Sequence, residues 1–236
     1  MGDLVEYHCA RSVAEIAMDD GKVNVLSPSM QLELAEALDQ AERDESAVVL
    51  KGRPGVFSAG FDLDVLKAGG DDAFSMVRGG FLLTERLLSF PYPVVIACSG
   101  HAVAMAVFLV LSADYRVGVS GEFRLRANEV AIGLTMPRAA IAICRERLSP
   151  AAFTRAMMLS ETFSPTQAVE AGILDLVVEP SDLETRTQQL AVTFRGLDMT
   201  AHRNTKLRAR HSLLESLRAS IEQDDSDLRA LADVAR

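Results

Sequence analysis

The 236-residue sequence predicts an α/β fold. Apolar segments of strand length alternate with helical patterns through residue 119, and glycines follow the strands expected at 47–50 and 94–98. From Pro137 onward the pattern is mostly helical. Alternating strands and helices are typical of a sheet covered by helices, in which ligands gather at the carboxyl ends of the strands. The loops that follow strands are therefore the first places to look for chemistry.

The beginning of the chain has the pattern of a β-α-β unit. Residues 13–18 alternate in the manner of a strand, and Asp19-Asp20-Gly21 follows as a turn. Ser27 and Pro28 then predict a helix start, with Ser as N-cap and Pro at the first helical position. Residues 47–50 predict a short buried strand, which completes the unit.

The middle of the chain repeats this alternation. Residues 52–62 form a glycine-rich loop, followed by a short helix over 63–68 and a longer helix over 72–88. Strands are predicted over 94–98 and 115–119, and the apolar segment 102–111 between them is interpreted as a buried helix. After Pro137, a single strand-like run at 173–178 interrupts the helices.

The end of the chain is a charged, amphipathic segment without a strand signal. We expect two regions, a core over 1–195 and a C-terminal helical region over 196–236. The apolar stripe of the second region can pack either on a partner subunit or on its own domain; it consists of Leu207, Leu213, Leu214, Leu217 and Ile221.

Composition and missing motifs exclude several function classes. A net charge of −9 argues against a nucleic-acid partner. The N-terminus resembles no secretory signal, and the longest apolar run is shorter than the ~20 residues that span a bilayer, so no membrane partner is expected. Three scattered cysteines fit a reducing cytoplasm. Phosphate-loop, dinucleotide, HExxH and GxSxG motifs are absent and the four histidines do not cluster, so neither a metal nor a separate cofactor is expected.

Two glycine-containing junctions remain as candidates for chemistry. They are FSAGFDL at 57–63 and GHAVAMA at 100–106, and each joins a strand to a helix start. Such junctions leave backbone N–H groups unpaired, and two donors aimed at one point make an oxyanion hole. Taken alone, each junction is more often an ordinary loop.

Four segments together resemble the crotonase (enoyl-CoA hydratase/isomerase) superfamily. They are FSAGFDL, the run from Pro93 to Arg116, NEVAIGLTMP at 128–137 and FSPTQAVEAGILDLVVE at 163–179, and the resemblance extends over about residues 10–180. It implies a crotonase-like core of repeated ββα units with a C-terminal helical trimerisation region. It also implies an acyl-CoA thioester substrate, and a homotrimer or a dimer of trimers.

The resemblance assigns roles to individual positions. The oxyanion-hole donors fall on the N–H groups of Phe61 and Met105, where the family usually has glycine at the second position. Glu129 corresponds to a catalytic glutamate, whereas Phe108 stands where hydratases carry their other one. The implied substrate-binding residues are Lys22, Val23, Val25, Ala59, Gly60, Asp62, Leu63, Phe108 and Leu134. Asp114 and Arg116 also match family positions and are interpreted as structural.

The single glutamate favours one reaction over another. Hydration needs a water molecule that is held and deprotonated, which Phe108 cannot do. Moving a double bond needs one base, and burial raises the pKa of a carboxyl toward neutrality. The Asn128-Glu129 pair and the apolar residue 108 resemble the mitochondrial-type Δ3,Δ2-enoyl-CoA isomerases.

Three hypotheses follow for the activity. The first is a Δ3,Δ2-enoyl-CoA isomerase that uses Glu129. The second is a weak hydratase that uses Glu129 with a water network or another carboxylate, for which Glu122, Glu85 and Asp64 are the candidates. The third is an acyl-CoA-binding protein that has lost catalysis.

Overall fold

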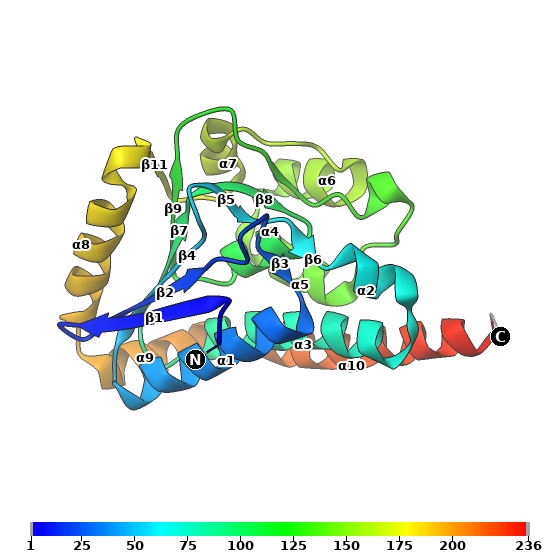
Figure 1. Cartoon of the computed structure of the whole chain (residues 1–236), viewed down its shortest axis with the longest axis horizontal. Helices are drawn as coiled ribbons and strands as arrows, with labels where there is room; N and C mark the ends of the chain where they lie inside the picture. Colours follow the sequence, from blue (N-terminus) through cyan, green and yellow to red (C-terminus); the bar gives the residue numbers. More distant parts are fainter. Residues whose placement is uncertain (1, 235–236) are drawn as a thin grey trace.

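The computed structural model describes residues 2–234 and is built on a six-stranded sheet (Figure 1). The strand order is β1 (Val5–Ala10), β2 (Val13–Met18), β4 (Ala47–Lys51), β7 (Val94–Cys98), β9 (Tyr115–Val119) and β11 (Leu176–Val178). β1 pairs antiparallel with β2, and every other pairing is parallel. The four middle strands were predicted from the sequence and are confirmed. β1 was not predicted, and β11 is shorter than the predicted run over 173–178.

Two smaller sheets include residues that were predicted to form the loop over 52–62 and the start of the helix over 102–111. A parallel sheet has the order β10 (Leu125–Arg126), β8 (Gly100–Val103) and β5 (Gly55–Ser58), and a two-stranded sheet pairs β3 (Val25–Leu26) with β6 (Gly60–Phe61). The prediction of a loop over 52–62 was therefore wrong in part. The helix predicted from residue 102 begins later, as α4 (Met105–Leu111). The error arose because strand and helix are both buried here, and a continuous apolar run does not reveal the change between them.

Helices cover both faces of the six-stranded sheet, as Figure 1 shows. α8 (Leu183–Arg195) lies on one face against β2, β4, β7 and β9. The other face carries the main core, against which α1 (Pro28–Arg43), α3 (Gly70–Ser89) and α4 pack. The remaining helices are α2 (Leu63–Ala68), α5 (Arg138–Arg147), α6 (Pro150–Leu159), α7 (Pro165–Ala171), α9 (Met199–Ala209) and α10 (His211–Val234), with short turns η1 (Val130–Ile132) and η2 (Pro180–Asp182). Among residues 2–234, no helix is long and apolar enough to cross a membrane.

The helix start predicted at Ser27 and Pro28 is confirmed. The Ser27 hydroxyl accepts a hydrogen bond from the Met30 N–H at 3.2 Å, and Pro28 is the first helical residue. Serine caps one of the N–H groups that a helix start leaves unpaired, and proline has no N–H to leave unpaired. The cap thus sets the boundary between β3 and α1. β3 contains Val25, one of the predicted substrate-binding residues.

The C-terminal region packs on its own chain. α10 lies against α3 and α5, and the apolar stripe is buried in the main core through Leu213, Leu214, Leu217 and Ile221. Arg218 of α10 forms an ion pair with Glu85 of α3 at 2.7 Å. Of the two arrangements that the sequence allowed for the stripe, the structure has the intramolecular one. Assembly into trimers stays a prediction.

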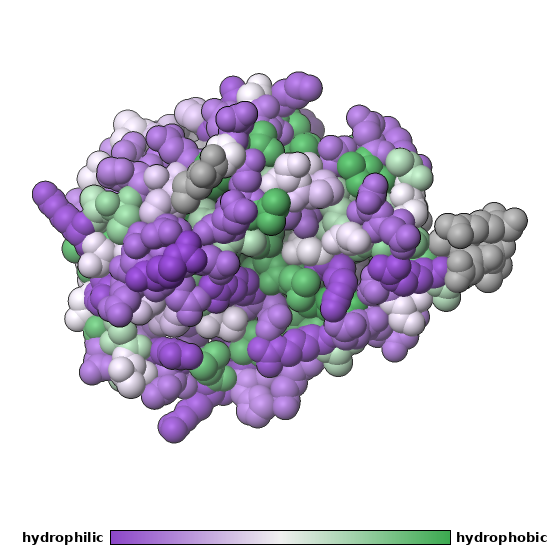
Figure 2. Space-filling model, turned by 60° about the horizontal axis from the view of Figure 1, so that its bottom comes forward, coloured by the Kyte–Doolittle hydropathy of each residue, from purple (hydrophilic) through white to green (hydrophobic). Residues whose placement is uncertain are grey.

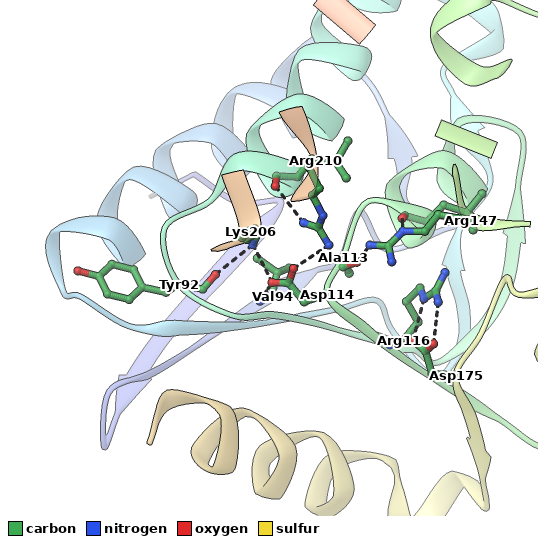
Figure 3. Close-up of polar contacts among 11 residues, drawn as sticks. Tyr92, Val94, Ala113, Asp114, Arg116, Arg147, Asp175, Lys206 and Arg210 are labelled. Carbon is green, nitrogen blue, oxygen red and sulfur yellow. Dashed lines mark hydrogen bonds and ion pairs between the residues drawn. The ribbon is translucent and has the colours of Figure 1, made fainter. Parts of the chain in front are cut away.

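A buried group of ion pairs joins the C-terminal end of α9 to Asp114, the residue directly before β9 (Figure 3). The Asp114 carboxylate lies 2.7 Å from the Lys206 Nζ and 2.9 Å from the Arg210 Nη2. Next to it, the Arg116 guanidinium donates two hydrogen bonds to Asp175, which follows α7. Asp114 and Arg116 thus have structural contacts, as their interpretation from the sequence anticipated.

An apolar groove runs along the outer surface between α1 and α3. It has a volume of about 430 Å³, and the exposed side chains of Leu32 and Leu82 border it. Figure 2 shows green, apolar residues gathered in the middle of the face that carries these helices. None of the predicted site residues lines this groove, so it is separate from the candidate active site.

Candidate active site

The small parallel sheet β10-β8-β5 brings the three predicted reactive positions to one edge. β5 leads through Ala59 into Phe61, β8 leads into Met105, and β10 leads into Glu129. Because the carboxyl ends of parallel strands meet at the same edge of a sheet, residues far apart in sequence become neighbours there. The topology thus places the two predicted backbone donors and the predicted catalytic carboxylate after neighbouring strands of one sheet.

Gly60 is the point at which the first two junctions touch. Its φ is +88°, and a Cβ placed there would lie 2.8 Å from the Val103 carbonyl oxygen and 3.2 Å from the Met105 nitrogen. A side chain would therefore collide with the backbone, and the left-handed conformation also favours glycine. The absence of a side chain at Gly60 allows the loop of Phe61 to lie against the first turn of α4.

Met105 begins α4 with its N–H at the open end of the helix. Among the described residues no side chain caps this end, and the first N–H groups of a helix have no partner within it. The preceding Ala104 has φ 53°, a conformation that is strained for a residue with a side chain and that occurs at functional sites. The Met105 side chain is buried and reaches toward α3. A methionine at this position is thus compatible with a free backbone donor.

Asp62 and Leu63 have different surroundings. The Asp62 carboxylate accepts hydrogen bonds from the N–H groups of Asp64, at 2.9 Å, and Val65, at 3.4 Å. It is therefore the N-cap of α2, and its carboxylate is engaged in that role. Leu63, by contrast, has 56 % of its surface exposed and is free to contact a ligand.

The loop with Lys22, Val23 and Val25 lies beside the first junction. The Ala59 N–H donates to the Val23 carbonyl at 3.0 Å, and β3 pairs Val25 with Gly60. These contacts place two segments side by side, 22–25 and 59–63, and these segments contain most of the residues that the resemblance implied for substrate binding.

Two residues that the sequence analysis did not assign to the site, Asp20 and Asn24, hold this loop in place. The Asp20 carboxylate accepts from the N–H groups of Lys22, Asn24 and Val25, and these bonds lower its pKa although burial alone would raise it. Asn24 has φ 54° and its amide donates to the Phe57 carbonyl, at the end of β5. The Asp-x-x-x-Asn spacing was a usable signal, since both residue types favour such turns.

Glu129 is a buried carboxyl without a partner for one of its oxygens. It is 9 % exposed, and among the described residues its Oε2 has no hydrogen-bond partner. Burial raises the pKa of Glu129 above its ordinary value. The turn η1 directly after it is held by Ser160, whose hydroxyl accepts from the Ala131 N–H at 3.2 Å. An unpaired, desolvated carboxyl on a fixed turn has the properties of a general base.

Phe108 fills the core behind the site. It is 1 % exposed, and its ring stacks on Phe81 of α3 with 6.1 Å between the ring centroids. The three alternative carboxylates have other surroundings: Glu85 pairs with Arg218 of α10, whereas Asp64 and Glu122 are exposed. Of the acids that the sequence analysis weighed, Glu129 is the one that the fold buries.

Comparison with known proteins places the chain in a family. Residues 8–235 match the family model for enoyl-CoA hydratase/isomerase, and the chain belongs to this family. An enoyl-CoA hydratase structure from Mycobacterium marinum has 46 % identity and a TM-score of 0.92, covering 96 % of this chain and all of that one. An enoyl-CoA isomerase structure from Mycobacterium tuberculosis has 45 % identity and a TM-score of 0.92, covering 96 % and 99 %. Human mitochondrial enoyl-CoA delta isomerase 1 is 26 % identical, over 96 % of this chain and 76 % of its own length.

These relatives confirm the crotonase-like α/β core with C-terminal helices that the sequence predicted. They carry the names of two reactions, since hydratases and isomerases both occur among the similar proteins. Membership of the family therefore does not distinguish the two. The reaction has to be argued from the residues at the site.

Proposed function

We propose that this chain is a Δ3,Δ2-enoyl-CoA isomerase that uses Glu129 as its single acid/base. The observation that carries the proposal is a lone buried carboxylate at 129 combined with a packed phenylalanine at 108. A hydratase must hold and deprotonate a water molecule, for which it uses a pair of acidic groups. The buried Phe108 ring, at the position of one of them, has no group that can take part. A double-bond shift requires one group that first accepts and then returns a proton.

The reaction proceeds by two proton transfers on one face of the substrate. Glu129 removes a proton from C2 of a 3-enoyl-CoA, and the electron pair of that C–H bond forms the dienolate. The N–H groups of Phe61 and Met105 donate hydrogen bonds to the thioester oxygen, where the negative charge develops. The protonated Glu129 then gives its proton to C4, which leaves the 2-enoyl-CoA and regenerates the carboxylate.

Exposed apolar residues near the site support an acyl-CoA as the substrate. Val23, Leu63 and Leu134, all predicted to bind substrate, are 47 %, 56 % and 51 % exposed. Large apolar side chains left in water around one site are typical of a surface that a ligand covers. The pantetheine arm and acyl chain of a thioester are ligands of that kind.

A comparison of two substrates on one protein preparation tests the proposal. We expect isomerisation of 3-hexenoyl-CoA to exceed hydration of crotonyl-CoA in kcat/KM by about 100-fold or more, the contribution typical of one positioned acid or base. Faster hydration would reverse the assignment in favour of the second hypothesis. Binding of hexanoyl-CoA without turnover of either substrate would favour the non-catalytic protein.

The pH profile reports on Glu129. The base form is the carboxylate, so kcat/KM for isomerisation should rise with pH as Glu129 loses its proton and should fall as pH drops through its pKa. Because burial raises that pKa, the midpoint should lie above the ordinary value of 4.5. Initial rates across a pH series measure it. A midpoint at or below the ordinary value would mean that another group limits the reaction.

A further inference from the structure

The side chains of both predicted oxyanion-hole residues converge on one glycine of α3. A Cβ placed on Gly80 would lie 2.5 Å from Cε1 and 2.7 Å from Cζ of the Phe61 ring. The same Cβ would lie 3.4 Å from the terminal methyl of Met105. Gly80 is buried within the 20-residue helix α3, so its bare backbone forms the surface on which these two side chains rest.

This contact joins the two junctions a second time. Gly60 brings their backbones together, whereas Gly80 holds their side chains. A side chain locked by packing limits how its own backbone can turn, and sites that must be accurate are held by such supports on rigid elements. α3 packs on α1 and α10, which makes it suitable as that support.

We propose that Gly80 is a positioning residue of the oxyanion hole. Its missing side chain lets Phe61 and Met105 dock on α3, so that their N–H groups keep the spacing needed to bind one thioester oxygen. This rests on the proposed role of those two N–H groups. The proposal also assigns a structural role to the Met105 side chain, because a glycine at this position would have no side chain to pack on α3.

The neighbouring glycine supplies a matched control. A Cβ on Gly79 would meet the Gln31 amide, which is buried beside the surface groove and donates to the Leu26 and Met76 carbonyls, and not the Phe61 ring or the Met105 methyl. Gly79→Ala and Gly80→Ala bring the same gain in helix propensity. They differ in which neighbour must move: the Gln31 amide or the Phe61 ring.

The experiment uses the full chain with 2,4-hexadienoyl-CoA, whose absorption band moves to longer wavelength when its carbonyl is polarised. Wild type and Gly79→Ala should give the same red shift on binding, and Gly80→Ala a smaller one. With 3-hexenoyl-CoA, Gly80→Ala should lower kcat by about 10- to 100-fold, because small misplacements of a catalytic group cost that much. KM should change by less than about threefold, since the N–H groups act most strongly on the charge of the transition state.

A second pair of variants guards against simple misfolding. Phe61→Leu removes the ring edge that the new methyl would strike, so adding Gly80→Ala to it should reduce kcat and red shift little further. Met105→Ala withdraws one docked side chain without any collision and should also reduce the red shift. The proposal is overturned if folded Gly80→Ala keeps the wild-type red shift and kcat, or if Gly79→Ala loses as much.

The two proposals can fail separately. If wild type shifts the absorption band but does not isomerise 3-hexenoyl-CoA, the assigned reaction is wrong, and the red shift of the Gly80→Ala variant still decides its positioning role. If wild type binds the probe without any red shift, the oxyanion hole itself is absent and the role of Gly80 falls with it.

Discussion

Glu129→Gln should lower kcat for isomerisation of 3-hexenoyl-CoA by about 10²- to 10⁴-fold, the usual loss when a positioned acid/base is removed. The amide keeps the size of the carboxyl but cannot accept the C2 proton. Binding of hexanoyl-CoA, measured by titration calorimetry, should change by less than about threefold, because this saturated thioester is bound without any proton transfer to Glu129. A loss confined to kcat is the mark of a group that acts in the transition state.

The variant should also be no less stable than wild type. Glu129 is buried with an unpaired Oε2, and a charged carboxylate in that place costs free energy that a neutral amide avoids. Glu122→Gln serves as the control, because this carboxylate is exposed and should not affect the rate. Glu129→Gln with more than a tenth of the wild-type kcat would show that Glu129 is not the base.

The large features of the fold could be predicted because they depend on local patterns. Strands β2, β4, β7 and β9 are short apolar runs with turn residues beside them, and α1 has a serine cap and a proline at its start. β3, β6 and β10 have two residues each and exist only because another segment pairs with them. No periodicity can be read from two residues.

Sequence analysis could propose site residues where a role is tied to one position in a sequence motif. The resemblance assigned the catalytic role to Glu129 through the motif at 128–137 and placed Phe108 at the other acid position, and both assignments stay predictions. Gly80 could not be identified in this way, because its importance lies in contacts with Phe61 and Met105, which are 19 and 25 residues away. Contacts of that kind depend on the packing of α3 and leave no signal in the sequence around Gly80.

The largest loss of stability is expected for Asp114→Ala, at about 3–5 kcal/mol. The side chains of Lys206 and Arg210 are 4 % and 13 % exposed, and Asp114 neutralises both (Figure 3). Burial alone would raise the pKa of Asp114, but these two cations lower it. The Asp114 carboxylate also accepts from the Val94 N–H at 2.8 Å, at the start of β7. Removing it leaves the buried charges of Lys206 and Arg210 without the carboxylate that pairs with both.

The pH dependence distinguishes this charge effect from a loss of packing. Burial lowers the pKa of Lys206 to about 8 in the folded protein, below its ordinary value of 10.5. A lysine pKa that is lower in the folded than in the unfolded protein reduces the free energy of unfolding, because folding disfavours the protonated form. This reduction is complete below the folded-state pKa and disappears as pH rises toward 10.5. Asp114→Ala should lower the folded-state pKa of Lys206 further, so its stability deficit should narrow between about pH 6 and pH 9, as pH passes from that lower pKa to the wild-type value of about 8.

Urea unfolding of wild type and variant at both pH values measures the deficit. Glu222→Ala is the control, because the Glu222 side chain is 67 % exposed and ion pairs of exposed groups contribute about 0–1 kcal/mol. A deficit that is equal at both pH values would mean that Asp114 acts through its hydrogen bond to Val94 rather than through charge. A deficit below about 1 kcal/mol would mean that apolar contacts hold α9 on the sheet. The ion pairs would then contribute little to its attachment.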